Sequence, residues 1–281
     1  MGSIVIKLKN LISIPRPHLF VIPAAVGICG YVLSSSKVDL FGIIFSILIP
    51  ILIWSGGQTF NDFYDADFDK VYHPEWPIPS GNITKKTALV YGSLFYALGI
   101  ICSLGFNIYC TIVTLFIIFF SFIYSKLKRK GIYGNICFGI CVSLCLLIGS
   151  TIAKNTTFMI FYIMLISILI HMSDNIIGTF ADMDVDKKLG FNTLPIEFGI
   201  KKSARICLLF IIISFIMTLI LSGFTLNYFL PLAIIAFISI FWSSLMVYSN
   251  PRKFTKISGF WIVYSFFMGE ILFYMSFLVG G

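Results

Sequence analysis

Charged residues are scarce in this sequence, and the shortage excludes a soluble protein. Asp, Glu, Lys and Arg make up 11% of the 281 residues, whereas they form about a quarter of a typical soluble domain. So few charges cannot cover the water-facing surface of a chain of this size. The 58% of apolar residues also exclude a disordered chain, because disordered chains are poor in apolar side chains. The mean hydropathy of +0.98 indicates a protein that crosses a membrane several times.

Cysteine pairs and long hydrophilic segments are missing too. The seven cysteines form no CxxC pair, and all of them lie inside or at the edges of apolar stretches. Thiols in such places behave as small hydrophobic side chains, so we expect neither disulfides nor a cysteine metal site. Because no hydrophilic region is long enough for a second domain, we expect one transmembrane domain over residues 1–281.

Nine apolar stretches are long enough to cross a membrane as helices. They lie near 18–35, 39–60, 87–105, 108–124, 134–153, 156–175, 203–222, 227–248 and 257–279. A hydrocarbon layer about 30 Å thick needs roughly 20 helical residues. The stretches are continuous rather than alternating, which favours helices over a membrane barrel. The predicted fold is an all-α bundle of nine transmembrane helices.

Basic residues divide unevenly between the two sides of such a bundle. With a cytoplasmic N-terminus, 18 of the 20 Lys and Arg residues fall on the cytoplasmic side, and only Lys37 and Lys154 fall on the other. Cytoplasmic loops carry the Lys and Arg excess in membrane proteins. We therefore expect a multi-pass membrane protein with its C-terminus on the opposite side. The net charge of +8 is spread over loops facing anionic lipid, so we expect no nucleic-acid partner.

Acidic residues, by contrast, gather in two segments. Ten of the twelve lie in residues 62–75 and 174–197, which follow the second and sixth apolar stretches. The string Asp65-Ala-Asp67-Phe-Asp69-Lys70 recurs 117 residues later as Asp182-Met-Asp184-Val-Asp186-Lys187. The repeat indicates an internal duplication that brings two equivalent acidic loops together.

Carboxylates at these spacings can hold a metal ion. On a helix, Asp62, Asp65 and Asp69 share one face, and so do Asp182 and Asp186. Crowded carboxylates need a counter-ion, and an all-oxygen donor set suits Mg²⁺ that also binds substrate phosphates. Two such faces across a cavity would hold a diphosphate through bridging Mg²⁺. The alternatives are solvated charges that complement nearby lysines, or a Ca²⁺ site, although no EF-hand loop is present.

Further segments surround the two motifs. Asn61 precedes the first motif, and Ile78-Pro79-Ser80-Gly81 follows it. Tyr124-Ser-Lys-Leu-Lys128-Arg129 is followed by Gly134-Asn135, and Asp186-Lys-Lys-Leu-Gly190 is followed by Thr193-Leu194-Pro195. In these residues, and in its NDxxDxxxD and DxxxD motifs, the sequence resembles the UbiA superfamily of intramembrane prenyltransferases over most of its length.

The resemblance implies a polyprenyl diphosphate donor held by two Mg²⁺ ions and ionised to an allylic cation, which a lipophilic acceptor in the membrane then captures. The residues that it implies as Mg²⁺ ligands and catalytic groups are Asp62, Asp65, Asp69, Asp182 and Asp186, with Asn61 assisting. Lys128 and Lys187 would contact the diphosphate. Tyr124 would orient the phosphate or stabilise positive charge.

Residues 72–77 depart from the family pattern, which carries two arginines before its Pro-Ser-Gly segment. Here both arginines are gone, and His73 and Trp76 stand in their place. Arginine is suited to bidentate carboxylate or phosphate recognition, so its loss argues against a benzoate-type or phosphorylated acceptor bound in the usual manner. His73 is either a phosphate ligand or a solvated loop residue. Trp76 is either an interfacial anchor or an aromatic wall facing the cation.

Three functions follow from these patterns. The leading one is Mg²⁺-dependent transfer of a polyprenyl group to an aromatic ring or lipid alcohol. The alternative is a terpene cyclase on the same scaffold, which needs no acceptor and is favoured by the lost arginines. A transporter would need ionisable residues deep in the spans, where Asp174 and Glu270 are the only acidic candidates. We interpret His171 as an interhelical hydrogen-bonding residue.

Overall fold

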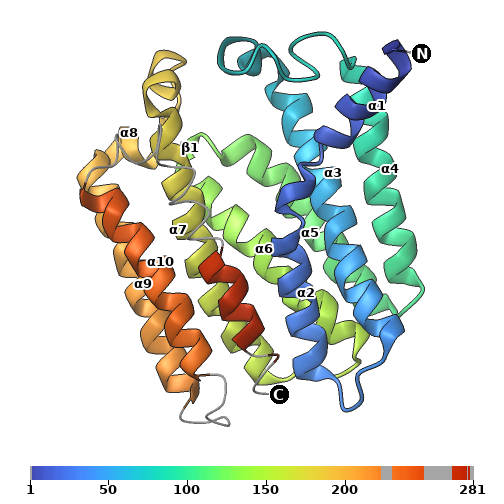
Figure 1. Ribbon diagram of the computed structural model, residues 1–281, viewed down its shortest axis with the longest axis vertical. Helices are drawn as coiled ribbons and strands as arrows, with labels where there is room; N and C mark the ends of the chain where they lie inside the picture. The colour runs from blue at the N-terminus through green and yellow to red at the C-terminus, as the bar shows by residue number, and fades with distance from the viewer. Residues whose placement is uncertain (1, 223–229, 250–267, 277, 279–281) are drawn as a thin grey trace.

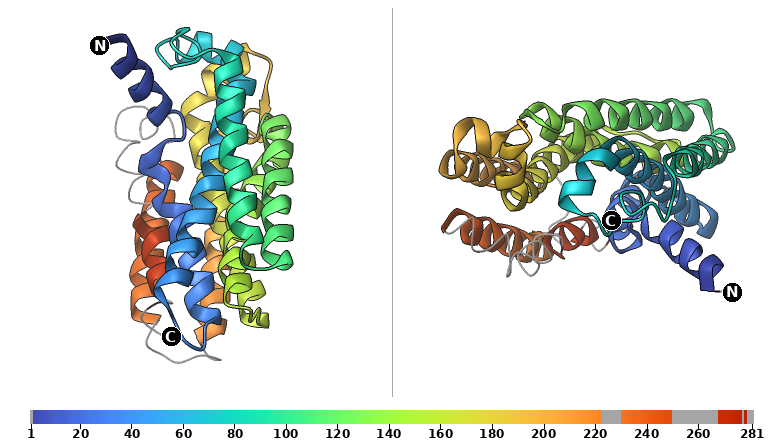
Figure 2. Two further views of the ribbon diagram at one scale, coloured as in Figure 1. Left: turned by 90° about the vertical axis from the view of Figure 1, so that its right-hand side faces the viewer. Right: turned by 90° about the horizontal axis from the view of Figure 1, so that it is seen from above.

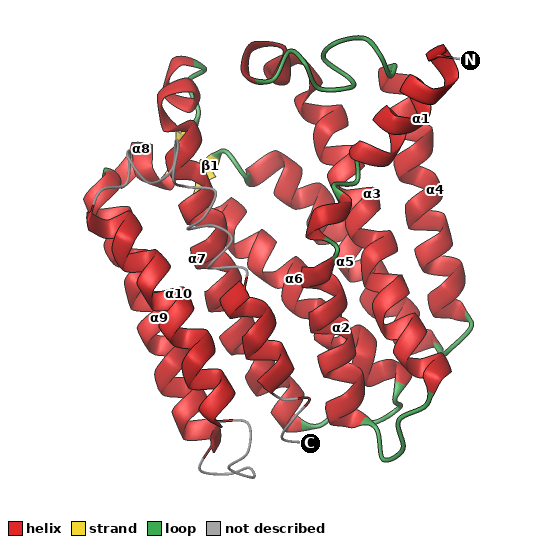
Figure 3. Ribbon diagram, viewed as in Figure 1, coloured by secondary structure: helices red, strands yellow, loops and turns green. Residues whose placement is uncertain are grey.

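Long apolar helices lie side by side in the computed structural model of the protein (Figure 1). The structure describes residues 2–222, 230–249, 268–276 and 278. The long helices are α1 (Gly2–Ser13), α2 (Val21–Ser34), α3 (Leu40–Tyr72), α4 (Lys85–Leu104), α5 (Ile108–Leu127), α6 (Tyr133–Ile152), α7 (Phe158–Lys188), α9 (Ile200–Ser222) and α10 (Leu230–Ser249). Figure 3 shows two short strands among them, β1 (Lys130–Gly131) and β2 (Asn192–Thr193). Two short helices complete the described elements, η1 (Pro17–Leu19) and α8 (Leu194–Phe198).

The all-α prediction agrees with the structure, whereas the count of nine spans is not confirmed. Within the described residues, six helices are long and apolar enough to cross a membrane. A seventh span results if the bent pair Leu8–Leu19 and Val21–Ser34, which meets at 52°, is counted as one. The apolar part of α10, Leu230–Met246, is shorter. Of the ninth stretch expected at 257–279, residues 257–267, 277 and 279 lie outside the described residues.

The acidic motifs lie on helices rather than in loops, which corrects the sequence-based expectation. Helix α3 has 33 residues and α7 has 31, so each is about 45–50 Å long at 1.5 Å per residue. That length exceeds a hydrocarbon layer of about 30 Å. The last turns of both helices therefore extend beyond their apolar spans and carry the carboxylates.

Local sequence explains where these extensions end. No Gly or Pro interrupts α3 between Gly57 and Pro74, and a residue before proline is driven out of the helical region. His73 accordingly leaves the helix with φ −139°. Helix α7 ends on two lysines, which favourably face its negative carboxyl end. Gly190 follows with φ +72°, a conformation in which glycine is unstrained.

Close packing of α2 on α6 forms the centre of the bundle. A Cβ atom on Gly30 would lie 2.1 Å from the backbone oxygen of Leu146, and one on Gly149 would lie 2.1 Å from that of Gly27. Only glycine permits such an approach, and small residues have this role at helix interfaces in membranes. Viewed from above, α2, α10 and the helical segment 268–276 lie on one face, with α5 and α6 behind them (Figure 2). The ends of α3 and α7 that carry the motifs lie at the same end of the bundle as α1 (Figure 1).

Candidate active site

A polar cavity of about 340 Å³ lies between the carboxyl ends of α3 and α7. We call it the polar cavity throughout. Its lining comprises Asn61, Asp65, Asp69, His73, Trp76, Tyr124, Lys128, Arg129, Asp174, Asn175, Gly178, Thr179, Asp182, Asp186 and Thr193. The structure thus brings both acidic motifs to one chamber, although 117 residues separate their equivalent positions.

On the α3 side, the buried Asp65 carboxylate forms ion pairs with two cations from the end of α5. Lys128 donates to the side chains of both Asn61 and Asp65. Arg129 Nη2 lies 2.7 Å from Asp65 Oδ1. Burial lowers the pKa of the Lys128 ammonium group, and the Asp65 carboxylate opposes that shift. A cation held in this place is suited to an anionic ligand in the polar cavity.

Asp62 faces a cation from the N-terminal segment instead. Arg16 Nη2 donates to Asp62 Oδ1 at 2.8 Å, and its Nη1 donates to Gln58 Oε1 at 2.7 Å. The Arg16 guanidinium also lies 4.9 Å from the centre of the Trp76 ring. Asp62 is buried but is not part of the lining of the polar cavity.

Two loops are joined beside the polar cavity. Strands β1 and β2 pair in parallel, with Gly131 opposite Thr193. The Arg129 guanidinium lies over the rings of both Phe68 and Phe191, 4.3 Å and 4.2 Å from their centres, and the two ring centres are 5.0 Å apart. These contacts hold the segment that follows α5 against the ends of both α3 and α7. They explain how the two acidic faces come to share one chamber.

Of the three predicted residues on α7, two line the polar cavity and one does not. Asp182 and Asp186 line the polar cavity. Lys187 is exposed and does not line it, so the structure does not bring this predicted diphosphate contact to the chamber.

His73 and Trp76 both line the polar cavity, and their rings stack with centres 4.0 Å apart. His73 Nδ1 also lies 3.4 Å from Glu75 Oε1.

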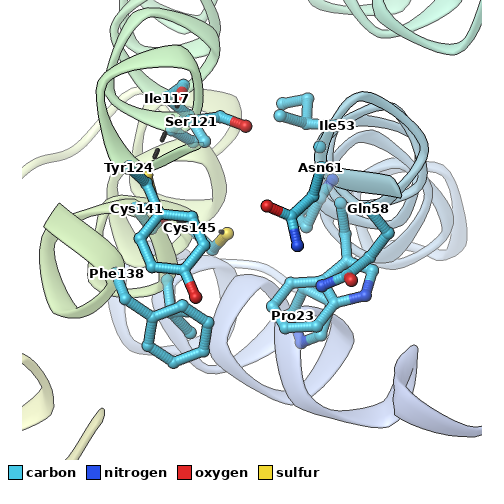
Figure 4. Close-up of a pocket in the computed structure, with 14 residues that line it drawn as sticks. Pro23, Ile53, Gln58, Asn61, Ile117, Ser121, Tyr124, Phe138, Cys141 and Cys145 are labelled. Atoms are coloured by element: carbon cyan, nitrogen blue, oxygen red, sulfur yellow. Dashed lines mark hydrogen bonds between the residues drawn. The ribbon is translucent and has the colours of Figure 1, made fainter. Parts of the chain in front are cut away.

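A smaller apolar cavity adjoins the polar one. Its lining comprises Pro23, Pro50, Ile53, Trp54, Gly57, Gln58, Asn61, Ile117, Ser121, Tyr124, Phe138, Cys141, Val142 and Cys145. Asn61 and Tyr124 belong to both cavities and face each other from α3 and α5 (Figure 4). Asn175 Nδ2 donates to the Tyr124 hydroxyl at 3.2 Å, and Asn135 Nδ2 donates to Asn175 Oδ1 at 2.8 Å. This chain of hydrogen bonds orients Tyr124 where the polar and apolar chambers meet.

The donor set of the polar cavity fits Mg²⁺ only together with further oxygen ligands. Within the described residues, no three His, Cys, Asp or Glu side chains converge closely enough to enclose one ion. Oxygen donors from Asp65, Asp69, Asp182 and Asp186 nevertheless face a common chamber. Mg²⁺ takes few protein carboxylates and completes its octahedron with water and phosphate oxygens. The residues therefore fit ions shared with a bound diphosphate.

Comparison with known proteins assigns the chain to a family. The model of the UbiA prenyltransferase family matches residues 20–275. The chain belongs to this family. As a member of this family, the protein is a prenyltransferase and not a transporter.

Curated relatives match over almost their full length. A digeranylgeranylglyceryl phosphate synthase from Pyrococcus horikoshii is 32% identical over 275 residues, covering 94% of this chain and 98% of the relative. One from Saccharolobus solfataricus is 30% identical over 282 residues, covering 95% of this chain and 99% of the relative.

Solved structures of UbiA-family proteins share the fold. A structure described as digeranylgeranylglyceryl phosphate synthase in membranes has a TM-score of 0.75 at 26% identity and covers 98% of both chains. A UbiA homolog from Archaeoglobus fulgidus bound to DMAPP and Mg²⁺ has a TM-score of 0.77 at 17% identity, covering 96% of this chain and 98% of that one.

Several residues of the site were not identified from the sequence. In the sequence, Arg16 is one of the cytoplasmic basic residues. Its position between Pro15 and Pro17 indicates a backbone of restricted conformation, which could have drawn attention to it. Asp174 and Asn175 precede Asp182 by two helical turns on α7 and also line the polar cavity. Their register on an extended helix could have placed them there once α7 was known to continue.

Proposed function

We propose that this UbiA-family protein transfers the prenyl group of a polyprenyl diphosphate to the hydroxyl group of a lipid alcohol, with Mg²⁺ as cofactor and diphosphate as the second product. One observation carries the proposal: carboxylates of both motifs line a single cavity together with Lys128. Anionic and cationic groups around one chamber match a metal–diphosphate complex, in which the metal neutralises part of the phosphate charge.

The metal would be held by oxygen donors from both sides of the polar cavity. Asp65 and Asp69 would supply them from α3, and Asp182 and Asp186 from α7. Asp62 pairs with Arg16 and, unlike these four carboxylates, does not line the polar cavity. We assign Asp62 to positioning Arg16, and to a metal only if that ion pair opens. Bound Mg²⁺ would stabilise the charge on the departing diphosphate.

The reaction follows from this arrangement. The C1–O bond of the donor breaks, its electron pair leaves with the diphosphate, and Lys128 faces the new negative charge. The allylic carbon would lie where the polar and apolar cavities meet, beside Tyr124 and Asn61. A hydroxyl oxygen of the acceptor then bonds to C1, and its O–H bond breaks as the proton is released. Electrostatic groups that are already in place cost no reorganisation at this step.

The apolar cavity receives the beginning of the prenyl chain. It measures about 80 Å³, whereas small-molecule sites usually measure about 300–1,000 Å³. A long chain would therefore continue between helices or into the surrounding lipid. Trp54 and Phe138, whose ring centres lie 6.2 Å apart, form part of the wall of this cavity.

The acceptor is inferred from the relatives. The product in their name carries two geranylgeranyl chains on a glyceryl phosphate. Removing one chain leaves geranylgeranylglyceryl phosphate as acceptor and geranylgeranyl diphosphate as donor. The loss of two arginines in 72–77 argued against a phosphorylated acceptor, but Arg16 supplies a guanidinium beside Trp76 from another part of the chain. We propose that Arg16 receives the acceptor phosphate, because guanidinium matches phosphate geometry.

The site is expected to face the cytoplasm. Eighteen of the 20 basic residues belong to the side that includes the N-terminus in the sequence-based topology. The motif ends of α3 and α7 lie at the end of the bundle where α1 lies. This orientation would give water-soluble Mg²⁺ and diphosphate direct access to the polar cavity.

Purified protein in detergent tests the proposal. With Mg²⁺ and geranylgeranyl diphosphate, product formation should depend on geranylgeranylglyceryl phosphate. Release of diphosphate with a cyclic hydrocarbon product and no acceptor would instead support the terpene cyclase.

Substitutions in the two acidic motifs test the roles assigned to Asp65 and Asp186. Asp65→Asn and Asp186→Asn should each lower transfer about 100-fold or more, because each removes charge stabilisation from the reaction centre. Asp67→Asn is the matched control. Asp67 lies in the same motif but is exposed and pairs with Lys85 and Lys70 at 2.6 Å and 3.1 Å. Equal activity of all three variants would contradict the assignment.

A further inference from the structure

One carboxylate in the polar cavity belongs to neither motif. Asp174 lines the cavity together with Asn175 and Tyr124. It precedes Asp182 by eight residues on α7 and thus lies about 12 Å deeper along the helix. This depth places Asp174 near the Tyr124–Asn175 hydrogen bond, where the polar and apolar cavities meet. An acceptor hydroxyl that attacks the allylic carbon would lie at the same level.

A buried polar network lies one turn deeper still. His171 Nδ1 is 2.9 Å from Glu270 Oε1, and both side chains are 1% exposed. His171 Nε2 is 3.0 Å from the Tyr274 hydroxyl, which lies 2.6 Å from Ser167 Oγ. Ionisable side chains inside a membrane protein are costly and usually functional. Among the described residues, Glu270 Oε2 has no hydrogen-bond partner.

Asp174 lies one helical turn from this network on α7. His171 and Asp174 stand three residues apart on one face of α7. Both ring nitrogens of His171 already face other groups, Glu270 and Tyr274. His171 therefore does not receive a proton directly from Asp174. The polar cavity remains as the route by which a proton on Asp174 reaches water.

We infer that the Asp174 carboxylate accepts the proton of the acceptor hydroxyl during prenyl transfer. This inference rests on the proposed function. The C1–O bond of the donor breaks and its electron pair leaves with the diphosphate. A lone pair of the acceptor oxygen forms the new bond to C1, the O–H bond breaks, and its proton moves to Asp174. Asp174 is available for this step because Asp65 pairs with Lys128 and Arg129, and the other carboxylates lining the polar cavity belong to the motifs.

The test separates proton acceptance from donor ionisation. Wild type, Asp174→Asn, Asp174→Glu and the control Asp67→Asn are compared with Mg²⁺ and geranylgeranyl diphosphate. Transfer to geranylgeranylglyceryl phosphate is one measurement, and slow hydrolysis of the donor to free prenyl alcohol without acceptor is the other. Asp174→Asn should lower the kcat of transfer about 100-fold, as loss of a general base does, while the donor KM and hydrolysis change less than about twofold. Asp174→Glu should regain about tenfold of the lost transfer, because the carboxylate is restored.

Three outcomes would overturn this inference. Unchanged transfer in Asp174→Asn would mean that diphosphate or water accepts the proton. A parallel loss of transfer and hydrolysis would assign Asp174 to donor binding or to folding. Equal transfer in the Asn and Glu variants would exclude a role for the carboxylate. A wild type that consumes donor without any acceptor-dependent product would contradict the proposed function itself, which distinguishes that failure from the first three.

Discussion

At the residue scale, Arg16 supplies a positive charge beside residues 72–77, where the sequence lacks the arginines of the family pattern. Residues 72–77 contain no arginine, yet Arg16 reaches this region from the turn before η1. Its backbone has φ 54°, a left-handed conformation that is uncommon for a residue other than glycine. Strained residues gather at functional sites. This backbone conformation supports a functional role for Arg16, which lies next to Trp76 and Asp62.

Replacing Arg16 tests that task. Arg16→Gln should raise the KM for the phosphorylated acceptor about tenfold or more, since a charge-assisted hydrogen bond is lost. Arg16→Lys should weaken binding less, because it keeps the charge without the fork of donors. Steady-state kinetics with geranylgeranylglyceryl phosphate and with its unphosphorylated analogue measure both effects. Equal KM changes for the two acceptors would contradict phosphate recognition by Arg16.

At the element scale, α3 combines a membrane span with an extension that carries part of the candidate site. The apolar residues of its first part cross the bundle, and its last turns carry Asn61, Asp65 and Asp69. A helix places these side chains more rigidly than a loop would, because successive backbone hydrogen bonds fix the chain that carries them. The opposite end begins at Asp39, whose carboxylate accepts from the Gly42 backbone N–H at 2.8 Å. Asp39 Oδ2 also accepts from the Tyr31 hydroxyl at 2.9 Å.

These hydrogen bonds make the start of α3 sensitive to acid. The bond from Gly42, followed by that from Tyr31, lowers the pKa of Asp39 below its usual value. A lowered pKa in the folded state stabilises the fold above the unfolded-state pKa of about 3.9, and this contribution is lost as pH falls through the folded-state pKa. Asp39→Ala should therefore lower the thermal unfolding midpoint at pH 7, with a difference from wild type that shrinks at low pH. A difference that persists at low pH would contradict the ionised cap.

At the scale of the whole molecule, two glycine contacts set the distance between α2 and α6. Gly30 packs on the Leu146 carbonyl, and Gly149 packs on Gly27. Helix α6 also supplies Asn135 to the hydrogen bonds that orient Asn175 and Tyr124. A shift of α6 would therefore reach the candidate site as well as the centre of the bundle.

Gly149→Ala tests this packing. The added methyl group would meet backbone atoms of α2, so the variant should lose about 1–3 kcal/mol of stability through overpacking. Gly178→Ala is the matched control for stability, because no heavy atom lies within 4 Å of its Cβ position. Thermal unfolding in detergent compares the two. Equal midpoints would show that α2 and α6 can move apart at little cost.

The membrane class, the helical fold and most of the residues that line the polar cavity could be predicted from the sequence. Lipid offers no partner for unpaired backbone groups, so only helices and closed barrels can cross it. The continuous rather than alternating apolar stretches favour helices. The repeated Asp spacing indicates two equivalent carboxylate faces because residues three and four apart share one side of a helix. These are local properties, so a single sequence is sufficient to derive them.

Tertiary structure decided which of these residues meet. Asp65 and Asp186 share a cavity, whereas Lys187 is exposed and does not line it. Arg16, from the N-terminal segment, contacts Asp62 and Trp76. The length of α3 and α7 also emerged only in the fold, because polar helical turns beyond a span have no hydropathy signal. Contacts between distant segments depend on how helices pack, and packing depends on shape along the whole interface. The proton acceptor proposed at Asp174 belongs to this second category, since only the shared chamber relates it to the reacting atoms.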